Sequence, residues 1–393
     1  MVADFASLQS LLATKEIIIC CGSGGVGKTS IAASIALGAT KHVGGRVLVI
    51  TVDPARRLAS ALGLGELGNV PRRIDIGAVD SDDPGCHGEL WAVMLDTKQS
   101  WDDLVMRHAP DEATAFRILD NRLYHSLTAR FVQSHDYIAM ERLYELHESG
   151  HYDLIVVDTP PTRNALDFLD APKRMAEFFR GRLLRWLTLP YRVGGRRGTR
   201  LIEAASRPFY QVADRLLGSR FLHEIAEFFL NFQTMYDGFV ERSVSVERLV
   251  ADHRTSFVVV STLENSPLRE AELFTAELRK RGVHVGAMIL NKTLPGYLLD
   301  ADGATVAKQL LEDSDGLASL VAPGDDRTAR VMRTIAQSYQ NFAIVAAREA
   351  ELRAGLSRES HLTIGVPARA ADISDLDGLG WISVHLFDNG SVA

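Results

Sequence analysis

The sequence predicts an α/β protein with a phosphate-binding loop and an inserted helical part. Three observations point to this class. An apolar run at 17–21, rich in β-branched residues, leads into a glycine-rich turn and then a helix. Further apolar runs that end in polar residues alternate with helical patterns along the chain. Residues 165–250 follow a helical period and hold 13 of the 29 aromatic residues.

The glycine-rich turn reads Gly-x-x-x-x-Gly-Lys-Thr between a strand and a helix, which is the context that a P-loop requires. Backbone N–H groups of such a loop surround a phosphate, and its glycines leave room for the approach. The helix N-terminus adds the positive end of a dipole. The residues expected to bind the nucleotide are Gly22, Ser23, Gly24, Gly25, Val26, Gly27, Lys28, Thr29 and Ser30.

Two side chains of this loop have specific expected roles. Lys28 should reach the β- and γ-phosphates and so serve catalysis, and the Thr29 hydroxyl should ligate Mg²⁺. ATP with Mg²⁺ is therefore the predicted ligand. The alternative is a chance glycine-rich turn, but the strand before it and the helix after it argue against this interpretation.

Two later strand ends carry carboxylates. Residues 46–52 predict a buried strand that ends at Asp53, and the proline after Asp53 keeps that residue extended, on a loop. Residues 154–157 are apolar and precede Asp158, which is the pattern of a Walker B strand that holds Mg²⁺. Ligand sites of open α/β sheets lie at the carboxyl ends of strands, so both carboxylates are site candidates. The alternative is that each is a turn residue.

The helical patterns divide the chain. We expect a P-loop domain formed by residues 1–99, 151–170 and 251–393, and a helical subdomain formed by residues 100–150 and 171–250. The apolar residues of the helical part recur on broad helical faces. They are either the core of that subdomain or an apolar groove that receives a partner.

Strand patterns return after residue 255. A strand at 256–260, a helix at 268–281 and a strand at 285–292 lead the chain back into the nucleotide domain. Asn291 ends the second of these strands, and its amide is suited to reading the edge of a base. A long helix is expected over 327–354, followed by a last strand that ends at the turn of Val366 and Pro367.

Composition narrows the function further. The 393 residues carry a net charge of −7, so no nucleic-acid partner is expected. The three cysteines form no C-x-x-C pair, so we expect neither a zinc site nor a disulfide framework. No apolar run reaches the length of a membrane span, and the N-terminus lacks the basic segment of a signal peptide. We expect a cytoplasmic protein that can also lie at the membrane periphery.

Five motifs follow one another along the chain. They are the P-loop, Asp53-Pro54-Ala55, the stretch from Asp158 to Thr162, the end of the Asn291 strand and the Val366-Pro367 turn. Together they resemble the ArsA-type ATPases, the arsenite-pump and tail-anchored-protein-targeting enzymes of the deviant Walker A class. The resemblance covers nearly the whole chain. It implies an eight-stranded, doubly wound, mostly parallel P-loop NTPase domain with an inserted α-helical subdomain, which works as a dimer of ATP sites.

The resemblance also implies roles for single residues. Asp53 would be the switch I carboxylate that orients or activates the attacking water and helps to hold the metal. Asp158 would begin switch II. Asn291 and the backbone around Pro367 would hold adenine, Glu264 would lie near a partner subunit, and the helical insertions would bind the client.

Several departures from the family pattern are visible. The deviant P-loop carries a signature lysine that reaches across the dimer, and Ser23 stands at that position here. Arg163-Asn164 replaces the usual Gly-His of switch II, and Arg57 replaces an asparagine of switch I. The metalloid-binding cysteines and the zinc C-x-x-C are absent, so neither arsenite transport nor a zinc-clasped dimer is carried over.

We therefore expect a Mg²⁺-dependent ATPase whose dimer opens and closes to handle an apolar client, such as a membrane-protein segment, or to energise a membrane transporter. Ser23 favours a heterodimer with a paralogous ATPase subunit over a homodimer. One alternative is a partition or positioning ATPase acting on DNA or a membrane surface, which the acidic stretch at 372–377 disfavours. Another is a non-catalytic ATP-binding subunit of a heterodimer.

Overall fold

The fold is built on a single eight-stranded sheet with the strand order β3-β4-β2-β5-β1-β6-β7-β8. Every neighbouring pair is parallel except β3 and β4, so the α/β class predicted from the sequence is confirmed. The strands are β1 (Ile17–Cys21), β2 (Arg46–Thr51), β3 (Arg72–Ile74), β4 (Glu89–Met94), β5 (Leu154–Asp158), β6 (Thr255–Ser261), β7 (Val285–Thr293) and β8 (Leu362–Pro367). This computed structural model describes residues 5–52, 57–65, 67–77, 88–130, 132–159, 170–171, 173–174, 177, 219–321, 326–356 and 362–388.

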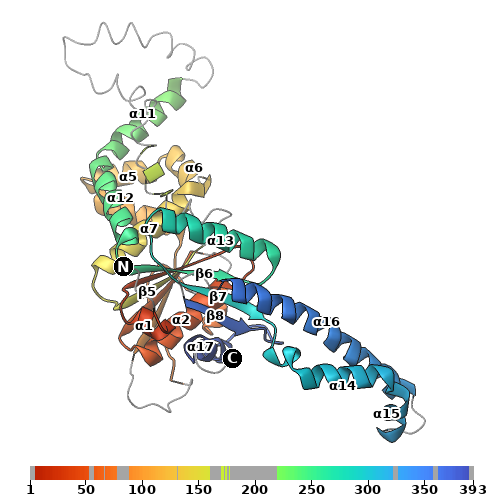
Figure 1. The fold of residues 1–393 in the computed structure, drawn as a ribbon. Coiled ribbons are helices and arrows are strands. Elements are labelled where there is room, and N and C mark those ends of the chain that lie inside the picture. Colours follow the sequence, from red (N-terminus) through yellow and green to blue (C-terminus); the bar gives the residue numbers. More distant parts are fainter. Residues whose placement is uncertain are drawn as a thin grey trace, which may run out of the picture.

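Helices cover both faces of the sheet, as the doubly wound class requires (Figure 1). One face packs against α1 (Leu8–Leu12), α2 (Lys28–His42), α3 (Arg57–Ala61) and α17 (Leu376–Phe387). The other packs against α7 (Val132–Glu148), α12 (Tyr236–Ala251), α13 (Asn265–Lys280) and the C-terminal end of α16 (Asp326–Leu356). Strands covered on both sides are apolar throughout, which is why β1 and β5 read as continuous apolar runs.

The helical insertion has a core of its own. It contains α4 (Thr97–His108), α5 (Glu112–Leu119), α6 (Arg122–Arg130), α11 (Ser219–Gln233) and the N-terminal halves of α7 and α12. Phe228 and Phe232 lie in this core with only 2% and 4% of their surface exposed, and their ring centroids are 5.4 Å apart. At these two positions the apolar face is therefore packing surface rather than the wall of a groove. The apolar residues at 175–187 also follow a helical period, but they lie outside the described residues apart from residue 177.

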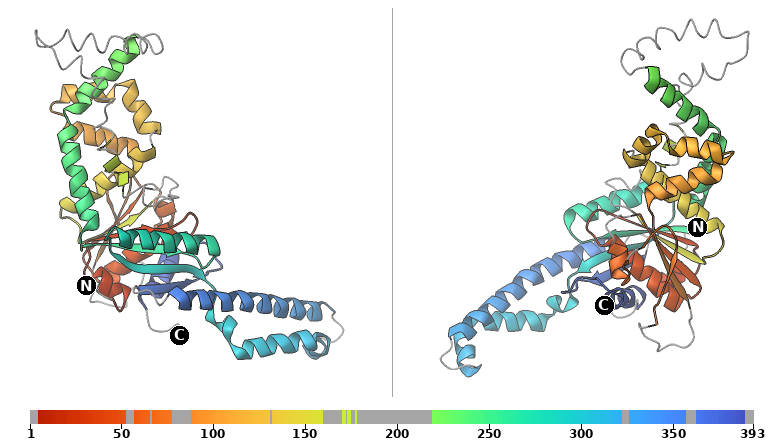
Figure 2. Two further views of the ribbon diagram at one scale, coloured as in Figure 1. Left: turned by 45° about the horizontal axis from the view of Figure 1, so that its top comes forward. Right: turned by 180° about the vertical axis from the view of Figure 1, so that it is seen from behind.

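A helical hairpin leaves the body of the protein between β7 and β8, and the views of Figures 1 and 2 both show it projecting away from the sheet. It consists of the 3₁₀ helix η1 (Gly296–Leu299), α14 (Ala301–Glu312), α15 (Ser314–Val321) and α16, and we call it the arm. The long C-terminal helix was predicted, whereas α14 and α15 were not. None of the helices in the described ranges is long and apolar enough to cross a membrane.

Candidate functional site

The loop between β1 and α2 has the backbone geometry of a P-loop. Gly27 caps the N-terminus of α2 with a φ of 91°, and Gly25 has a φ of 82°, a conformation that favours glycine. A side chain at Gly22 would collide with the carbonyl oxygen of Val260 in β6, and one at Gly27 would collide with the Asn291 amide. These glycines let the loop lie close against the ends of two neighbouring strands.

Lys28 lies inside the loop rather than in solvent. Only 6% of its surface is exposed, and its Nζ donates a 2.8 Å hydrogen bond to the carbonyl oxygen of Ser23. The ammonium group therefore links the start of α2 to the start of the loop. Thr29 follows in the first turn of α2 and is half-buried, while Gly24 and Gly25 are exposed at the tip of the loop.

Asp158 ends β5 directly beside the P-loop strand. Its Cα is in register with Cys20 of β1 on one side and with Thr51 of β2 on the other. The carboxylate is almost fully buried, and Thr51 Oγ1 donates a 2.9 Å hydrogen bond to Oδ2. Thr159 Oγ1 donates a 2.8 Å hydrogen bond to the Cys20 carbonyl oxygen. These contacts hold the end of β5 against the end of β1.

The two cysteines of β1 are buried core residues. Burial raises the pKa of the Cys20 thiol well above its usual value, and the nearby Asp158 carboxylate raises it further. Burial likewise raises the pKa of the Cys21 thiol, although the charge of Lys28 opposes the shift. Both thiols therefore stay protonated near neutral pH and are poor metal ligands.

A sequence model of the family described as anion-transporting ATPase matches residues 15–310. The chain belongs to this family. It is 23% identical to a putative arsenical pump-driving ATPase 1 of Aquifex aeolicus, over 75% of this chain and 68% of that protein. It is 24% identical to the ATPase GET3 of Malassezia globosa, over 73% of this chain and 76% of the other. It is 26% identical to the ATPase GET3C of Arabidopsis thaliana, over 70% and 66% of the two chains.

Family membership makes the protein an ATP hydrolase that binds a nucleotide, so the predicted activity and the resemblance to ArsA-type ATPases are confirmed. The matched range contains the P-loop, the end of β5 and Asn291. It stops within α14, so α15, α16 and β8 lie beyond it.

Asn291 of the ATPase contacts the P-loop backbone. Its Nδ2 donates a 2.8 Å hydrogen bond to the Val26 carbonyl oxygen, and its Oδ1 accepts one from the Lys292 N–H. Pro367 ends β8, the strand next to β7, opposite Thr293. Both residues thus lie near the carboxyl edge of the sheet, and their contact with adenine remains a prediction.

Other predicted site residues of the ATPase lie outside the described residues. These are Asp53, Pro54 and Ala55, and the switch II residues from 160 onwards, including Arg163 and Asn164. Arg57 is described only as the first residue of α3. Glu264 is exposed at the N-terminus of α13.

Two buried hydroxyl groups near the P-loop lack a hydrogen-bond partner within the described part of the ATPase. They are Ser23 Oγ, in the loop itself, and Thr262 Oγ1, just beyond the carboxyl end of β6. An unpaired buried hydroxyl is costly, which points to a partner that arrives with the ligand. Sequence reasoning missed Thr262, although a polar residue that ends a buried strand is a recognisable signal.

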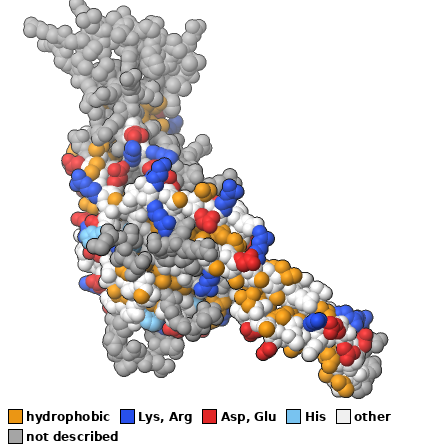
Figure 3. All heavy atoms as spheres, in the orientation of Figure 1, with side chains coloured by type: hydrophobic (Ala, Val, Ile, Leu, Met, Phe, Trp, Pro, Cys, Tyr) orange, Lys and Arg blue, Asp and Glu red, His pale blue; other side chains and the backbone are white. Residues whose placement is uncertain are grey.

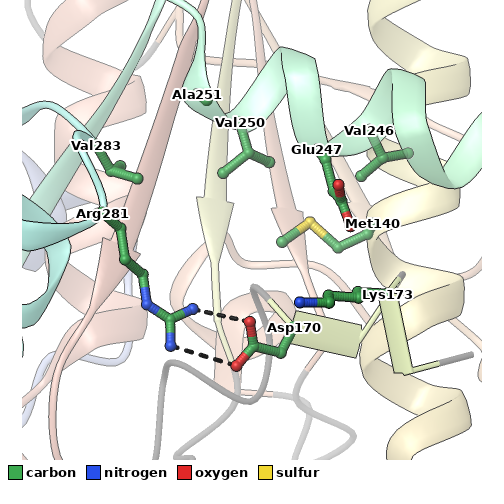
Figure 4. Close-up of a pocket in the computed structure, with 9 residues that line it drawn as sticks. All are labelled: Met140, Asp170, Lys173, Val246, Glu247, Val250, Ala251, Arg281 and Val283. Atoms are coloured by element: carbon green, nitrogen blue, oxygen red, sulfur yellow. Dashed lines mark hydrogen bonds and ion pairs between the residues drawn. The ribbon is translucent and has the colours of Figure 1, made fainter. Parts of the chain in front are cut away.

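A pocket of about 450 Å³ lies elsewhere on the ATPase, between α7, α12 and the segment after α13 (Figure 4). Arg281 crosses its rim and donates hydrogen bonds of 2.8 and 3.3 Å to the two carboxylate oxygens of Asp170. Ala251 and Val283, which line it, precede the amino ends of β6 and β7. The P-loop lies at the carboxyl ends of the strands, so this pocket is not the nucleotide site.

Proposed function

We propose that this ATPase requires Mg²⁺ and uses hydrolysis to handle an apolar protein client or to drive a membrane transporter. The Thr29 hydroxyl and the Asp158 carboxylate would hold the metal, and both offer the oxygen ligands that Mg²⁺ prefers. The hydrogen bond from Thr51 fixes the Asp158 side chain before the metal arrives. Bound Mg²⁺ would neutralise charge that develops on the phosphates.

The chain's own residues would divide the remaining work. Lys28 would leave the Ser23 carbonyl and contact the β- and γ-phosphates, so its present hydrogen bond keeps the ammonium in place for that exchange. Asp53 would orient and activate the attacking water. Asn291 would keep the loop in shape through Val26, and its amide would contact the base.

The observation that carries the coupling proposal is that α7 and α12 each belong to two cores. In α7, Tyr137 lies in the helical core and Leu143 lies in the core against the sheet. In α12, Phe239 lies in the helical core and Val246 lies in the core against the sheet. Because packed helices move as rigid rods, a change at the sheet is transmitted directly into the helical insertion.

Ion pairs reinforce this connection between the two parts. Arg142 of α7 donates a 3.1 Å hydrogen bond to the Asn69 carbonyl oxygen beside the sheet, and it pairs with Glu145, which also pairs with Arg107 of α4. Arg242 of α12 pairs with the buried Glu141 of α7 at 2.5 Å. A buried pair of this kind is costly to break, so α7 and α12 would shift together.

The working unit would be a dimer of ATP sites, and Ser23 favours a paralogous ATPase subunit as the second member. The relatives named arsenical pump-driving ATPase and GET3 support the two client classes, transporter and membrane-protein segment. Domain bounds of 1–99, 151–170 and 251–393 for the ATPase part, and 100–150 and 171–250 for the client part, belong to the same proposal.

The proposal is tested by measuring ATP binding calorimetrically and phosphate release kinetically, with and without Mg²⁺. Lys28→Ala should abolish tight ATP binding. Asp53→Asn should keep ATP bound and slow turnover by roughly 10²–10⁴. Lys308→Ala and Asp302→Asn, on the exposed side of α14, serve as matched controls. Unchanged ATP affinity in Lys28→Ala, or wild-type turnover in Asp53→Asn, would overturn these roles.

The coupling between the ATP site and the helical insertion is tested by a separate measurement. Hydrogen exchange in α7 and α12 of the Asp53→Asn variant should differ between the ATP-bound and the nucleotide-free states. Identical exchange in both states would contradict the coupling while leaving the ATP site intact.

A further inference from the structure

The interior of the arm is built from small side chains. Where α16 packs against α14, α15 and η1, most of the fully buried side chains are small. They are Ala307, Ser314, Ala318, Ala329 and Ala336. Leu298 of η1 is the one large apolar side chain buried to the same degree in this part of the arm, among the residues that the structure describes. Alanines bury little apolar surface, so this hairpin contributes little to its own stability through its interior.

Large apolar side chains of α16 face the solvent instead. Val331, Ile335, Phe342 and Val345 are 55%, 59%, 53% and 48% exposed, and Ser338 lies in the same row. Their successive spacings of four, three, four and three residues are those of a coiled-coil seam. The row runs along four turns of a helix and faces no other described element, and Figure 3 shows hydrophobic side chains gathered along the arm.

The first limb of the hairpin adds to the exposed apolar surface. Val306 of α14 is 53% exposed, and Leu320 and Val321 at the end of α15 are exposed still further. Isolated apolar residues on a surface are ordinary, but a continuous row of this length indicates an interface.

Charges on the two limbs are opposite. From residue 294 to residue 321 the arm carries five carboxylates and one lysine, for a net charge of −4. The outer part of α16, residues 326–333, carries Asp326 and the arginines Arg327, Arg330 and Arg333, for a net charge of +2. Arg333 pairs with Asp315 at 3.3 Å, which places Arg330 and Glu312 in the same outer part of the arm.

We propose that the arm is one half of a four-helix bundle, completed by the arm of a second copy of this chain. A two-fold axis along the bundle would lay α16 of each copy against α14 of the other. The seam from Val331 to Val345 would become the core, and Arg330 of one copy would face Glu312 of its partner. The surface of the arm is then complementary to itself, because it carries both the apolar seam and the opposite charges that pair across the two-fold axis.

The acidic first limb decides against an anionic membrane surface as the occupant, because that surface would repel it. The arm contains no P-loop residue, so the pairing does not rest on the proposed function and should occur without nucleotide. An ATP-dependent dimer at the P-loop face would be a separate contact.

The test is sedimentation velocity of the full-length chain, without nucleotide, over a range of concentrations up to about 100 μM. The wild type should dimerise. The double variant Ile335→Asp/Phe342→Asp should weaken dimerisation at least 100-fold, since it places charge in the seam. Ile344→Asp is the matched control, because Ile344 is 72% exposed on the same helix but lies off the seam. It should change the dimer affinity less than threefold.

A charge exchange tests the orientation of the two arms. Arg330→Glu and Glu312→Arg should each weaken the dimer about tenfold, since each places like charges opposite one another. The combined variant should return to within threefold of the wild type. Retained ATP binding by every variant would show that the ATPase part is folded.

Three results would overturn the proposal. The first is a wild-type chain that stays monomeric at every concentration. The second is an equal loss of dimer in Ile344→Asp and in the seam variant. The third is a combined charge variant that is weaker than either single change. Because no nucleotide is present, none of these results depends on the proposed ATP-site roles.

Discussion

Asp158 is a buried carboxyl group that a hydrogen bond from Thr51 holds in place. Burial of a carboxylate is costly unless hydrogen bonds or a cation compensate. Thr51 supplies one hydrogen bond to this carboxyl group. Lys28 lies in the same neighbourhood, because its charge and that of Asp158 both shift the pKa of the Cys20 thiol. A carboxyl group held beside a phosphate-binding loop is suited to a metal that arrives with the phosphate.

His108 provides a pH-dependent test at the same scale. Burial first, and then the charges of Arg242 and Arg107, lower its pKa from 6.5 to about 4. Between these two values the unfolded chain binds a proton that the folded chain does not. The free energy of unfolding should therefore fall as the pH drops from about 6.5 to 4.

His108→Gln keeps an acceptor for Arg242 but removes the titration. The change in the free energy of unfolding between pH 6.5 and pH 4 should be smaller in this variant than in the wild type. The difference should be about 1 kcal/mol, after allowing for solvent screening of a partly exposed ring. Urea unfolding at several pH values measures the change, with the exposed His151→Gln as control. A slope equal to that of the wild type would contradict the prediction.

Some residues of the site could be predicted from the sequence and others could not. The P-loop and Asp158 carry their signal locally, in a fixed spacing or at the end of an apolar run. Thr51 lies 107 residues from the carboxylate that it supports, and Thr262 lies on the strand end beside the loop only because β6 pairs with β1. Such contacts depend on strand order, which one chain does not reveal without its fold.

At the scale of elements, α7 and α12 explain why the aromatic stripes were ambiguous. Periodicity shows that a helix has an apolar face but does not show what covers it. The faces of α11 and α12 are covered by α4, α5, α6 and α7, which come from a distant part of the chain. The exposed seam of α16 has the same periodicity, and no element in the described part of the chain covers it. The sequence predicted it only as a long helix.

Phe228 tests the packing role of α11. Its ring packs edge-on against Phe229 and at a tilt against Phe232, so Phe228→Asp should destabilise the helical core by about 3–5 kcal/mol. Phe116→Asp is the matched control, because Phe116 is 60% exposed on α5 and should cost less than about 0.5 kcal/mol. Urea unfolding with ATP binding measured alongside separates loss of the helical part from loss of the whole fold. Equal stability of the two variants would mean that the face is not a core.

For the whole molecule, the strand order explains how distant segments build one site. β1 lies between β5 and β6, so the P-loop is next to Asp158 on one side and Thr262 on the other. The eight-stranded arrangement followed from the family resemblance rather than from periodicity, since the order of buried parallel strands leaves no trace in their apolar runs. The helical insertion follows β4 and β5, whose carboxyl ends lie at the same edge of the sheet as the P-loop.

The proposal of a heterodimer rests on position 23. In a symmetric pair of this class each subunit sends one lysine to its neighbour's phosphates, and Ser23 cannot provide that charge. Such a trans cation is worth roughly 10³–10⁵ in turnover by analogy with arginine fingers. Ser23→Lys should therefore raise the ATP turnover of the isolated chain by at least tenfold, because two identical subunits would then complete each other's sites. Ser149→Lys, in the exposed turn after α7, controls for added charge. Phosphate release from the purified chain measures both, and a wild-type chain that alone turns over as fast as the complex from native lysate would exclude a heterodimer.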